Sequence, residues 1–257
     1  MFSLKAGVTS TFIILIVFVI GMYIYMKISK KGMYFRRIPG LDALEECVGR
    51  AVEMGRPVQY SPGQKGVTDT NAPPTLAAIT MLSYVAQICA RKGANIGVSI
   101  MDAQVMPLVD QSLKEAYLAE GIDQYPKDGI QWLAPTQFSF AAAMLARLRR
   151  EKPAAIFYIG HCEAETLMIA ETGIEIGAMQ VMGTEAVAQL PFMTAAADYT
   201  IYGDEIYAAD AYLSRNVKTM GSLRTIDLGK LFAMLVIIIG SILSTFGISI
   251  LTQILKW

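Results

Sequence analysis

The stretch AAIFYIGHCEAETLMIAETGIEIGAMQVM, residues 154–182, decides the fold. Residues 154–159 are an uninterrupted apolar run, which is typical of a strand buried on both faces of a sheet. Residues 162–176 follow with helical spacing, and 178–182 form a second short apolar run. A strand, a helix and a strand in this order predict a right-handed βαβ unit.

The same alternation extends in both directions from this unit. Upstream, the periodicity predicts strands at 57–60, 95–101 and 131–134, and helices at 41–55, 74–92, 103–120 and 136–151. Downstream it predicts a helix through residue 190, a strand at 199–202 and a helix over 204–213. We therefore predict an α/β domain with Rossmann-like three-layer packing and a mostly parallel sheet. A barrel would need more units than the chain holds.

The helix predicted at 74–92 is almost uniformly apolar. It is short for a membrane span and carries Ser83, Gln87 and Arg91. We predict that it is buried instead, with another subunit as one candidate for its partner.

Two apolar segments lie at the ends of the chain, at residues 8–28 and 231–255. Each is long enough to cross a hydrocarbon core of about 30 Å. The first lacks the small-residue cleavage site of a signal peptide, so we predict a retained helix. In the second, Gly240, Ser244 and Gly247 share one face and favour helix packing in lipid. We predict membrane helices at 1–30 and 228–257 and an α/β domain at 31–227.

The basic residues of the flanks predict the orientation. The far sides carry only Lys5 and Lys256, and the domain side carries Lys27, Lys30, Lys31, Arg36, Arg37, Arg215, Lys218, Arg224 and Lys230. Positive flanks stay cytoplasmic, which predicts a two-pass protein of the cell membrane with both termini outside and a cytosolic domain. The three cysteines have no paired spacing and agree with a reducing compartment. The lipid bilayer is thus the first expected partner. The formal net charge is zero, which gives no reason to expect nucleic acid.

Candidate ligand-binding residues come from the predicted strand ends, because open α/β sheets bind ligands beyond the carboxyl ends of their strands. This rule selects Gly63, Asp102, His161, Glu163 and Thr184. The same positions also need turns and caps, and a helix N-cap is the favoured explanation for Thr184. The loop at 61–71 has neither dinucleotide nor P-loop spacing, so no cofactor is predicted.

The segment Gly160-His161-Cys162-Glu163-Ala164-Glu165 gathers the single histidine, a thiol and two carboxylates. A Cys–His nucleophile needs its side chains to meet, whereas neighbours at a turn usually point apart. A metal site needs further His or Cys ligands at suitable spacing, and the sequence has none. Glu163 and Glu165 are also explained by the positive end of the following helix.

Segments 40–57 (GLDALEECVGRAVEMGRP) and 197–205 (ADYTIYGDE) resemble an uncharacterised prokaryotic family of membrane-anchored α/β proteins of unknown function. The resemblance covers most of the predicted domain. It implies a bacterial or archaeal membrane location and supplies no activity, ligand or site residue.

Three functions stay open. We favour a non-catalytic, membrane-tethered module that self-associates and serves as a scaffold or recruits a cytosolic partner. Double anchoring, the apolar helix at 74–92 and the lack of catalytic motifs favour it. The alternatives are a small-molecule or nucleotide-binding enzyme or sensor at the strand ends, and an accessory subunit of a larger membrane complex.

Overall fold

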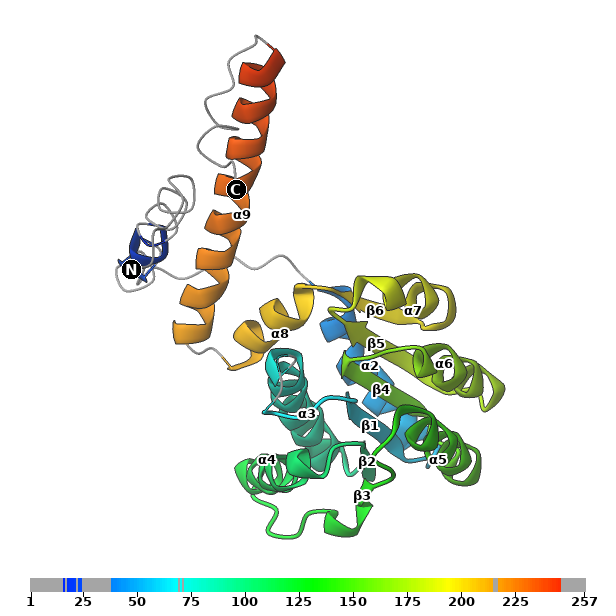
Figure 1. Ribbon diagram of the computed structural model, residues 1–257. Coiled ribbons are helices and arrows are strands. Elements are labelled where there is room, and N and C mark those ends of the chain that lie inside the picture. Colours follow the sequence, from blue (N-terminus) through cyan, green and yellow to red (C-terminus); the bar gives the residue numbers. More distant parts are fainter. Residues whose placement is uncertain are drawn as a thin grey trace, which may run out of the picture. The chain divides into compact units, whose positions relative to one another are not determined.

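The computed structural model describes residues 16, 18–21, 23–24, 38–68, 70, 72–214 and 217–245. The chain divides into two compact units, residues 35–214 and residues 1–34 together with 215–257. The elements, labelled in Figure 1 where there is room, are α2 (Pro39–Glu53), β1 (Val58–Gly63), α3 (Ala72–Lys92), β2 (Ile96–Ile100), η1 (Ala103–Val105), α4 (Met106–Ala119), η2 (Lys127–Gly129), β3 (Ile130–Trp132), α5 (Gln137–Glu151), β4 (Ala155–His161), α6 (Glu165–Glu175), β5 (Met179–Thr184), η3 (Val187–Gln189), α7 (Leu190–Ala196), β6 (Tyr199–Tyr202), α8 (Glu205–Ser214) and α9 (Val217–Thr245).

The six strands form one sheet in the order β3-β2-β1-β4-β5-β6. Every neighbouring pair is parallel. The predicted α/β class is therefore confirmed, with a sheet that is parallel throughout its described strands. The order is that of a doubly wound sheet, in which the chain reverses direction of travel between β1 and β4.

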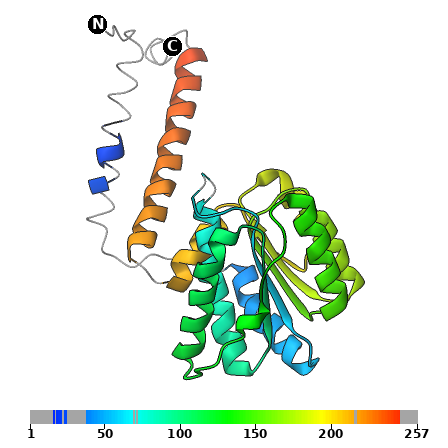
Figure 2. The same cartoon turned by 60° about the horizontal axis from the view of Figure 1, so that its bottom comes forward.

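Alternate residues of β4 explain why its sequence is apolar without a break. Phe157 and Ile159 join the core that α2, α3, α4 and α8 build on one face. Ile156 and Tyr158 join the core under α5, α6 and α7 on the other. Figure 2 shows the sheet between these two helical layers. Burying each large side chain contributes about 1.5–3 kcal/mol.

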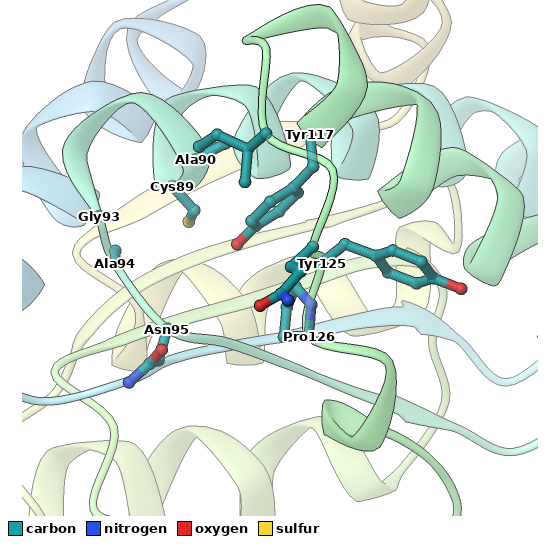
Figure 3. A pocket seen from close by; sticks show the side chains of 10 residues that line it. Cys89, Ala90, Gly93, Ala94, Asn95, Tyr117, Tyr125 and Pro126 are labelled. Carbon is teal, nitrogen blue, oxygen red and sulfur yellow. The ribbon is translucent and has the colours of Figure 1, made fainter.

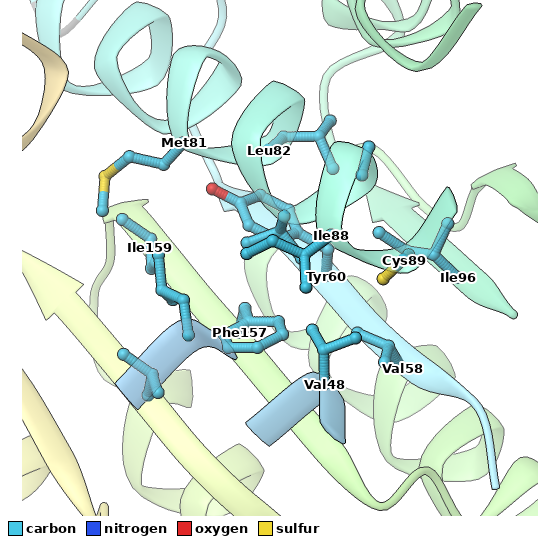
Figure 4. Packing of buried hydrophobic residues seen from close by; sticks show 14 of the residues in the cluster. Val48, Val58, Tyr60, Met81, Leu82, Ile88, Cys89, Ile96, Phe157 and Ile159 are labelled. Atoms are coloured by element: carbon cyan, nitrogen blue, oxygen red, sulfur yellow. The ribbon is translucent and has the colours of Figure 1, made fainter. Parts of the chain in front are cut away.

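Helix α3 is buried by its own chain. Its residues Met81, Leu82 and Ile88 pack over Tyr60 and Phe157 (Figure 4). The Tyr60 hydroxyl donates a hydrogen bond of 2.5 Å to the carbonyl oxygen of Ala78 within this layer. Helices α2, α4 and α8 cover the rest of α3. The prediction of a buried helix holds, and no second subunit is needed to explain its apolar composition.

The opposite face of the sheet holds a buried polar network beneath α5. Arg147, only 3% exposed, donates to the carbonyl oxygens of Val98 (3.1 Å) and Gly129 (3.0 Å). Its guanidinium also donates to the Ser99 hydroxyl at 3.1 Å, and that hydroxyl accepts a 2.9 Å bond from the Gln59 amide. The network is well connected and ties β1, β2 and η2 to α5.

Several boundaries differ from those predicted. Strand β1 continues to Gly63, into the segment 61–71 that was predicted to be a loop. Strand β4 runs on to His161, and α6 begins at Glu165 instead of residue 162. The glycine at 160 allows this because it adopts φ +130°, a value that other residues rarely reach. After β5, a short 3-10 turn precedes α7, which begins at Leu190, where a helix was predicted to end. Pro191 suits that beginning, because proline is well tolerated in the first helical turn.

The three thiols are distributed over both cores. Cys47 and Cys89 belong to the α3 face, and Cys162 belongs to the α5–α6 face. Burial raises the pKa of Cys47 and of Cys89 to about 12. Burial also raises the pKa of Cys162 well above its ordinary value.

Helix α9 is the principal element of the second unit. Two described helices are apolar and long enough to cross a membrane, α3 and the segment Thr225–Ile242 of α9. Whereas α3 lies in the core, the side chains of Leu231 and Ile237 on α9 are 58% and 66% exposed.

Among the described residues of the N-terminal apolar segment, Phe18 contacts α9 through an aromatic pair. The ring centroids of Phe18 and Phe232 lie 4.9 Å apart. A Cβ built on Gly229 would lie 3.6 Å from the Phe18 ring. Gly240 is eleven residues further on and so falls close to the same helical face. The side chain of Ser244, and all of Gly247, lie outside the described residues.

Candidate functional site

The candidate site lies where the chain reverses, at the carboxyl ends of β1 and β4. The two strand ends are joined by a 2.9 Å hydrogen bond from the Gln64 N–H to the His161 carbonyl oxygen. Gly63 adopts φ +80°, and a Cβ there would lie 2.6 Å from that same oxygen. At 160, a Cβ would clash with the Pro62 carbonyl oxygen. Two glycines thus permit the close approach of the two loops.

Four charged side chains form a chain across this edge. Lys65 Nζ lies 3.3 Å from Oε1 of Glu163. The same oxygen lies 3.5 Å from Nε2 of His161. On the other side of the imidazole, Nδ1 makes a short contact with Oε1 of Glu185. The order is therefore Lys65, Glu163, His161, Glu185, in which basic and acidic side chains alternate.

The imidazole of His161 is held by its acidic neighbours. The hydrogen bond to Glu185 raises the pKa of His161, and the charges of Glu185 and Glu163 act in the same direction. Partial burial and the nearby Lys65 oppose the rise. Nδ1 of His161 contacts Glu185, and Nε2 is directed toward Glu163. A carboxylate bonded to one ring nitrogen commonly fixes the tautomer of a histidine.

Glu165 is fully buried and structural. Its carboxylate accepts bonds from the Tyr158 hydroxyl (2.6 Å), the Gln137 amide (2.9 Å) and the Glu163 N–H (2.9 Å). Three donors satisfy a buried carboxylate, which would otherwise be costly. Glu163 and Glu165 were both predicted to interact with the positive end of α6. Glu165 lies in the first turn of α6, whereas the side chain of Glu163 contacts Lys65 and His161.

Cys162 is not positioned as a nucleophile. Its thiol is buried and donates to the Gly160 carbonyl oxygen at 3.4 Å. The raised pKa of this thiol keeps it protonated, and the thiolate is the reactive form. The His161 imidazole is engaged with Glu185 and Glu163 instead.

Thr184 and Asp102 serve turns. The Thr184 hydroxyl accepts from the backbone N–H groups of Cys162 (3.3 Å) and Ala186 (3.2 Å), so it joins two loops. The prediction that Thr184 caps a helix is therefore wrong. Asp102 accepts a 2.8 Å bond from the Gln104 N–H, which caps η1. The structure therefore brings Gly63, His161, Glu163 and Thr184 together, and places Asp102 at the end of the neighbouring strand.

Two buried polar atoms at this edge have no hydrogen-bond partner in the described structure. They are Oγ of Ser61 and Nε2 of Gln64. Ser61 is 0% exposed and Gln64 is 4% exposed. A third such atom, Oε1 of Gln180, lies elsewhere under α6. Buried polar groups are almost always satisfied, so two unsatisfied atoms at one edge need an explanation, with ordered water or a ligand as the candidates.

Sequence reasoning missed Gln64, Lys65 and Glu185 as members of the site. Glu185 directly follows the candidate Thr184, and Gln64 directly follows the candidate Gly63. Knowing the strand ends to one residue would have identified both. That register depends on the bulge between Ser61 and Gly63, which apolar patterning does not reveal.

The helix that follows β1 is poorly suited to bind phosphate. Anions bind helix N-termini through free N–H groups. At the start of α3, Pro73 and Pro74 have no N–H. The Thr75 hydroxyl donates to the Lys65 carbonyl oxygen at 3.0 Å. The usual dinucleotide mode, with pyrophosphate on this helix, therefore lacks its donors.

A cavity of about 320 Å³ lies away from this edge. Cys89, Asn95, Tyr117 and Tyr125 are among its lining residues (Figure 3). It opens near the amino ends of β2 and β3, whereas ligands of open sheets bind at the carboxyl ends. The polar edge at β1 and β4 is thus the stronger candidate. Within the described ranges, no three His, Cys, Asp or Glu residues are grouped to hold a metal ion.

A family model described as a domain of unknown function, DUF6754, matches residues 1–255. The chain belongs to this family. No curated protein and no solved structure matches the chain. The DUF6754 match spans both apolar end segments as well as the α/β unit.

Proposed function

We propose that this DUF6754 protein is a membrane-anchored α/β protein that binds a small polar ligand at the carboxyl ends of β1 and β4. The observation that carries the proposal is the pair of buried, unpartnered atoms, Ser61 Oγ and Gln64 Nε2. Leaving such a group unsatisfied costs about 1–3 kcal/mol. A ligand that supplies the missing hydrogen bonds would recover this free energy.

The position of these atoms supports binding over a purely structural role. They lie at the point where the strand order reverses, which is the usual ligand site of doubly wound sheets. The charged chain of Lys65, Glu163, His161 and Glu185 runs beside them and is partly open to solvent. A polar ligand can reach these groups, and a sensor or an enzyme would use the same arrangement.

Anchoring through both ends of the chain is the second part of the proposal. The exposed apolar side chains of α9 and the contact between Phe18 and Phe232 support a pair of neighbouring membrane helices. The basic flanks favour a cytosolic domain, and the family resemblance given above implies a prokaryotic cell membrane. Protease added to sealed, right-side-out cells should leave the domain intact. Cleavage within residues 38–214 would contradict this orientation.

Ligand binding is tested on the full chain purified in mild detergent. A panel of metabolites is screened by thermal shift, and hits are measured by ligand-observed NMR. Binding should weaken at least tenfold in Ser61→Ala and in Gln64→Leu. The control is Thr194→Ala, an exposed hydroxyl of α7 bonded to the Leu190 carbonyl oxygen. If no ligand in a broad panel binds, or if Ser61→Ala and Gln64→Leu bind as the wild type does, the proposal fails.

The scaffold hypothesis stays a separate prediction. One of its three motivations, the apolar helix at 74–92, is now explained by packing inside the same chain. Native mass measurement in mild detergent addresses what remains, and a strict monomer would contradict self-association.

A further inference from the structure

The charged groups of the site are already matched in pairs. Glu163 is paired with Lys65, and Glu185 is paired with His161. The remaining carboxylate, Glu165, is buried and satisfied by three neutral donors. An incoming anion would find Lys65 and His161 already paired with carboxylates, and it would also face three carboxylates. Burying an unpaired charge is strongly unfavourable.

The two helices that follow β1 and β4 offer few backbone donors for an anion. Helix α3 begins Ala72-Pro73-Pro74, and neither proline has an N–H. At the turn before α6, the Glu163 N–H already donates to Glu165. Glu163 and Glu165 place negative charge where a phosphate would otherwise bind. The edge is therefore poorly suited to a phosphate group.

The two atoms at the edge that lack a hydrogen-bond partner, Ser61 Oγ and Gln64 Nε2, belong to uncharged side chains. Gln64 Nε2 can only donate, whereas the Ser61 hydroxyl can donate and accept. The carboxylates of Glu163 and Glu185 have lone pairs beyond those used by Lys65 and His161. Ligand hydroxyl groups can accept from the amide and donate to the carboxylates.

We propose, on the basis of the ligand-binding function above, that the site takes an uncharged, hydroxyl-rich molecule and rejects its phosphorylated form. A sugar and a nucleoside share this chemistry. The selectivity comes from charge pairs that are complete before the ligand arrives, together with two helix N-termini that are poorly suited to phosphate.

Matched pairs of compounds test the proposal on the full chain in detergent. The pairs are glucose with glucose 6-phosphate and adenosine with AMP, measured by ligand-observed NMR. At least one unphosphorylated member should bind, and its phosphorylated partner should bind at least tenfold more weakly. The two pairs also distinguish a sugar site from a nucleoside site.

Glu163→Gln tests the source of the selectivity. It leaves Lys65 without its carboxylate, so the phosphorylated member should gain affinity relative to its partner by about tenfold. Glu175→Gln is the matched control, because Glu175 also lies on the α6 segment and pairs with a cation, Arg149, at 2.9 Å. It should leave the ratio of affinities unchanged.

The outcomes separate this inference from the proposed function. If a phosphorylated compound binds as tightly as its partner, the selectivity is overturned and ligand binding stands. If neither pair binds but ionic metabolites of the broad panel do, the inference again fails alone. If nothing in the broad panel binds, both fall, and ordered water remains as the partner of Ser61 and Gln64.

Discussion

Gln59 and Ser61 are two residues apart on β1 and point to the same face of the sheet, yet their surroundings differ. The Gln59 amide donates to the Ser99 hydroxyl and to the Tyr60 carbonyl oxygen, inside the network built around Arg147. The Ser61 hydroxyl is equally buried and has no partner in the described structure. One strand therefore contains a satisfied polar region in its middle and an unsatisfied one at its carboxyl end.

The amino edge of the sheet resembles the satisfied region. There Arg56 donates to the carbonyl oxygens of Lys152 (2.6 Å), Pro153 (3.0 Å) and Ile176 (2.9 Å), which joins the ends of α5 and α6. The difference indicates that the middle and the amino edge maintain the fold, and the contrast with the carboxyl edge is the basis of the proposed ligand site.

The largest effect should come from breaking the satisfied network. Arg147→Met removes a buried guanidinium together with its hydrogen bonds to the Ser99 hydroxyl and to the carbonyl oxygens of Val98 and Gly129, which should cost about 3–5 kcal/mol. Arg149→Met is the control, because Arg149 is exposed and its pair with Glu175 should contribute at most about 1 kcal/mol. Chemical unfolding of both variants measures the difference, and equal losses would contradict it.

A substitution at the turn between the two loops should have the next largest effect. Gly160→Ala imposes φ +130° on a residue with a side chain and directs its Cβ at the Pro62 carbonyl oxygen. The free energy of unfolding should fall by about 2–3 kcal/mol. Gly177→Ala also changes a positive-φ glycine, but no atom lies within 4 Å, so it should cost about 1 kcal/mol. Ligand binding should be lost only in Gly160→Ala. Thermal unfolding together with the binding assay checks both statements.

Two buried serines compare the two regions directly. Ser99→Ala removes the partner of Gln59 and of Arg147, so the free energy of unfolding should fall by about 1–3 kcal/mol. Ser61→Ala removes an unsatisfied hydroxyl and should leave that free energy unchanged or raise it by up to about 1 kcal/mol. Ser61→Ala should nevertheless weaken ligand binding. A stability loss as large as that of Ser99→Ala would show that Ser61 has a structural partner.

The smallest effect concerns pH. The pKa of His161 is higher in the folded than in the unfolded protein, chiefly because of its hydrogen bond to Glu185. The stabilisation is complete below the unfolded pKa of about 6.5 and is lost as the pH rises through the folded pKa. Glu185→Gln should lower that pKa and reduce this pH dependence, whereas Glu171→Gln on α6 should not. The chain has a single histidine, so NMR titration of the untagged protein follows one imidazole.

Apolar patterning predicted most strands and helices because strands buried on both faces leave uninterrupted apolar runs. It could not assign the partner of α3, because apolar residues record burial and not what buries them. The site was predicted in part, through His161 and Glu163 at a strand end. Glu185 and Gln64 were missed because their role depends on where β5 ends and on the bulge in β1.

The distribution of the three thiols has a practical consequence. Each is unreactive while its layer is closed, because alkylation needs a thiolate that burial disfavours. Cys47 and Cys89 become accessible when the α3 layer opens, and Cys162 becomes accessible when the α6 layer opens. Timed iodoacetamide labelling, followed by peptide mapping, would therefore show which side of the sheet detaches first, and no engineered cysteine is needed.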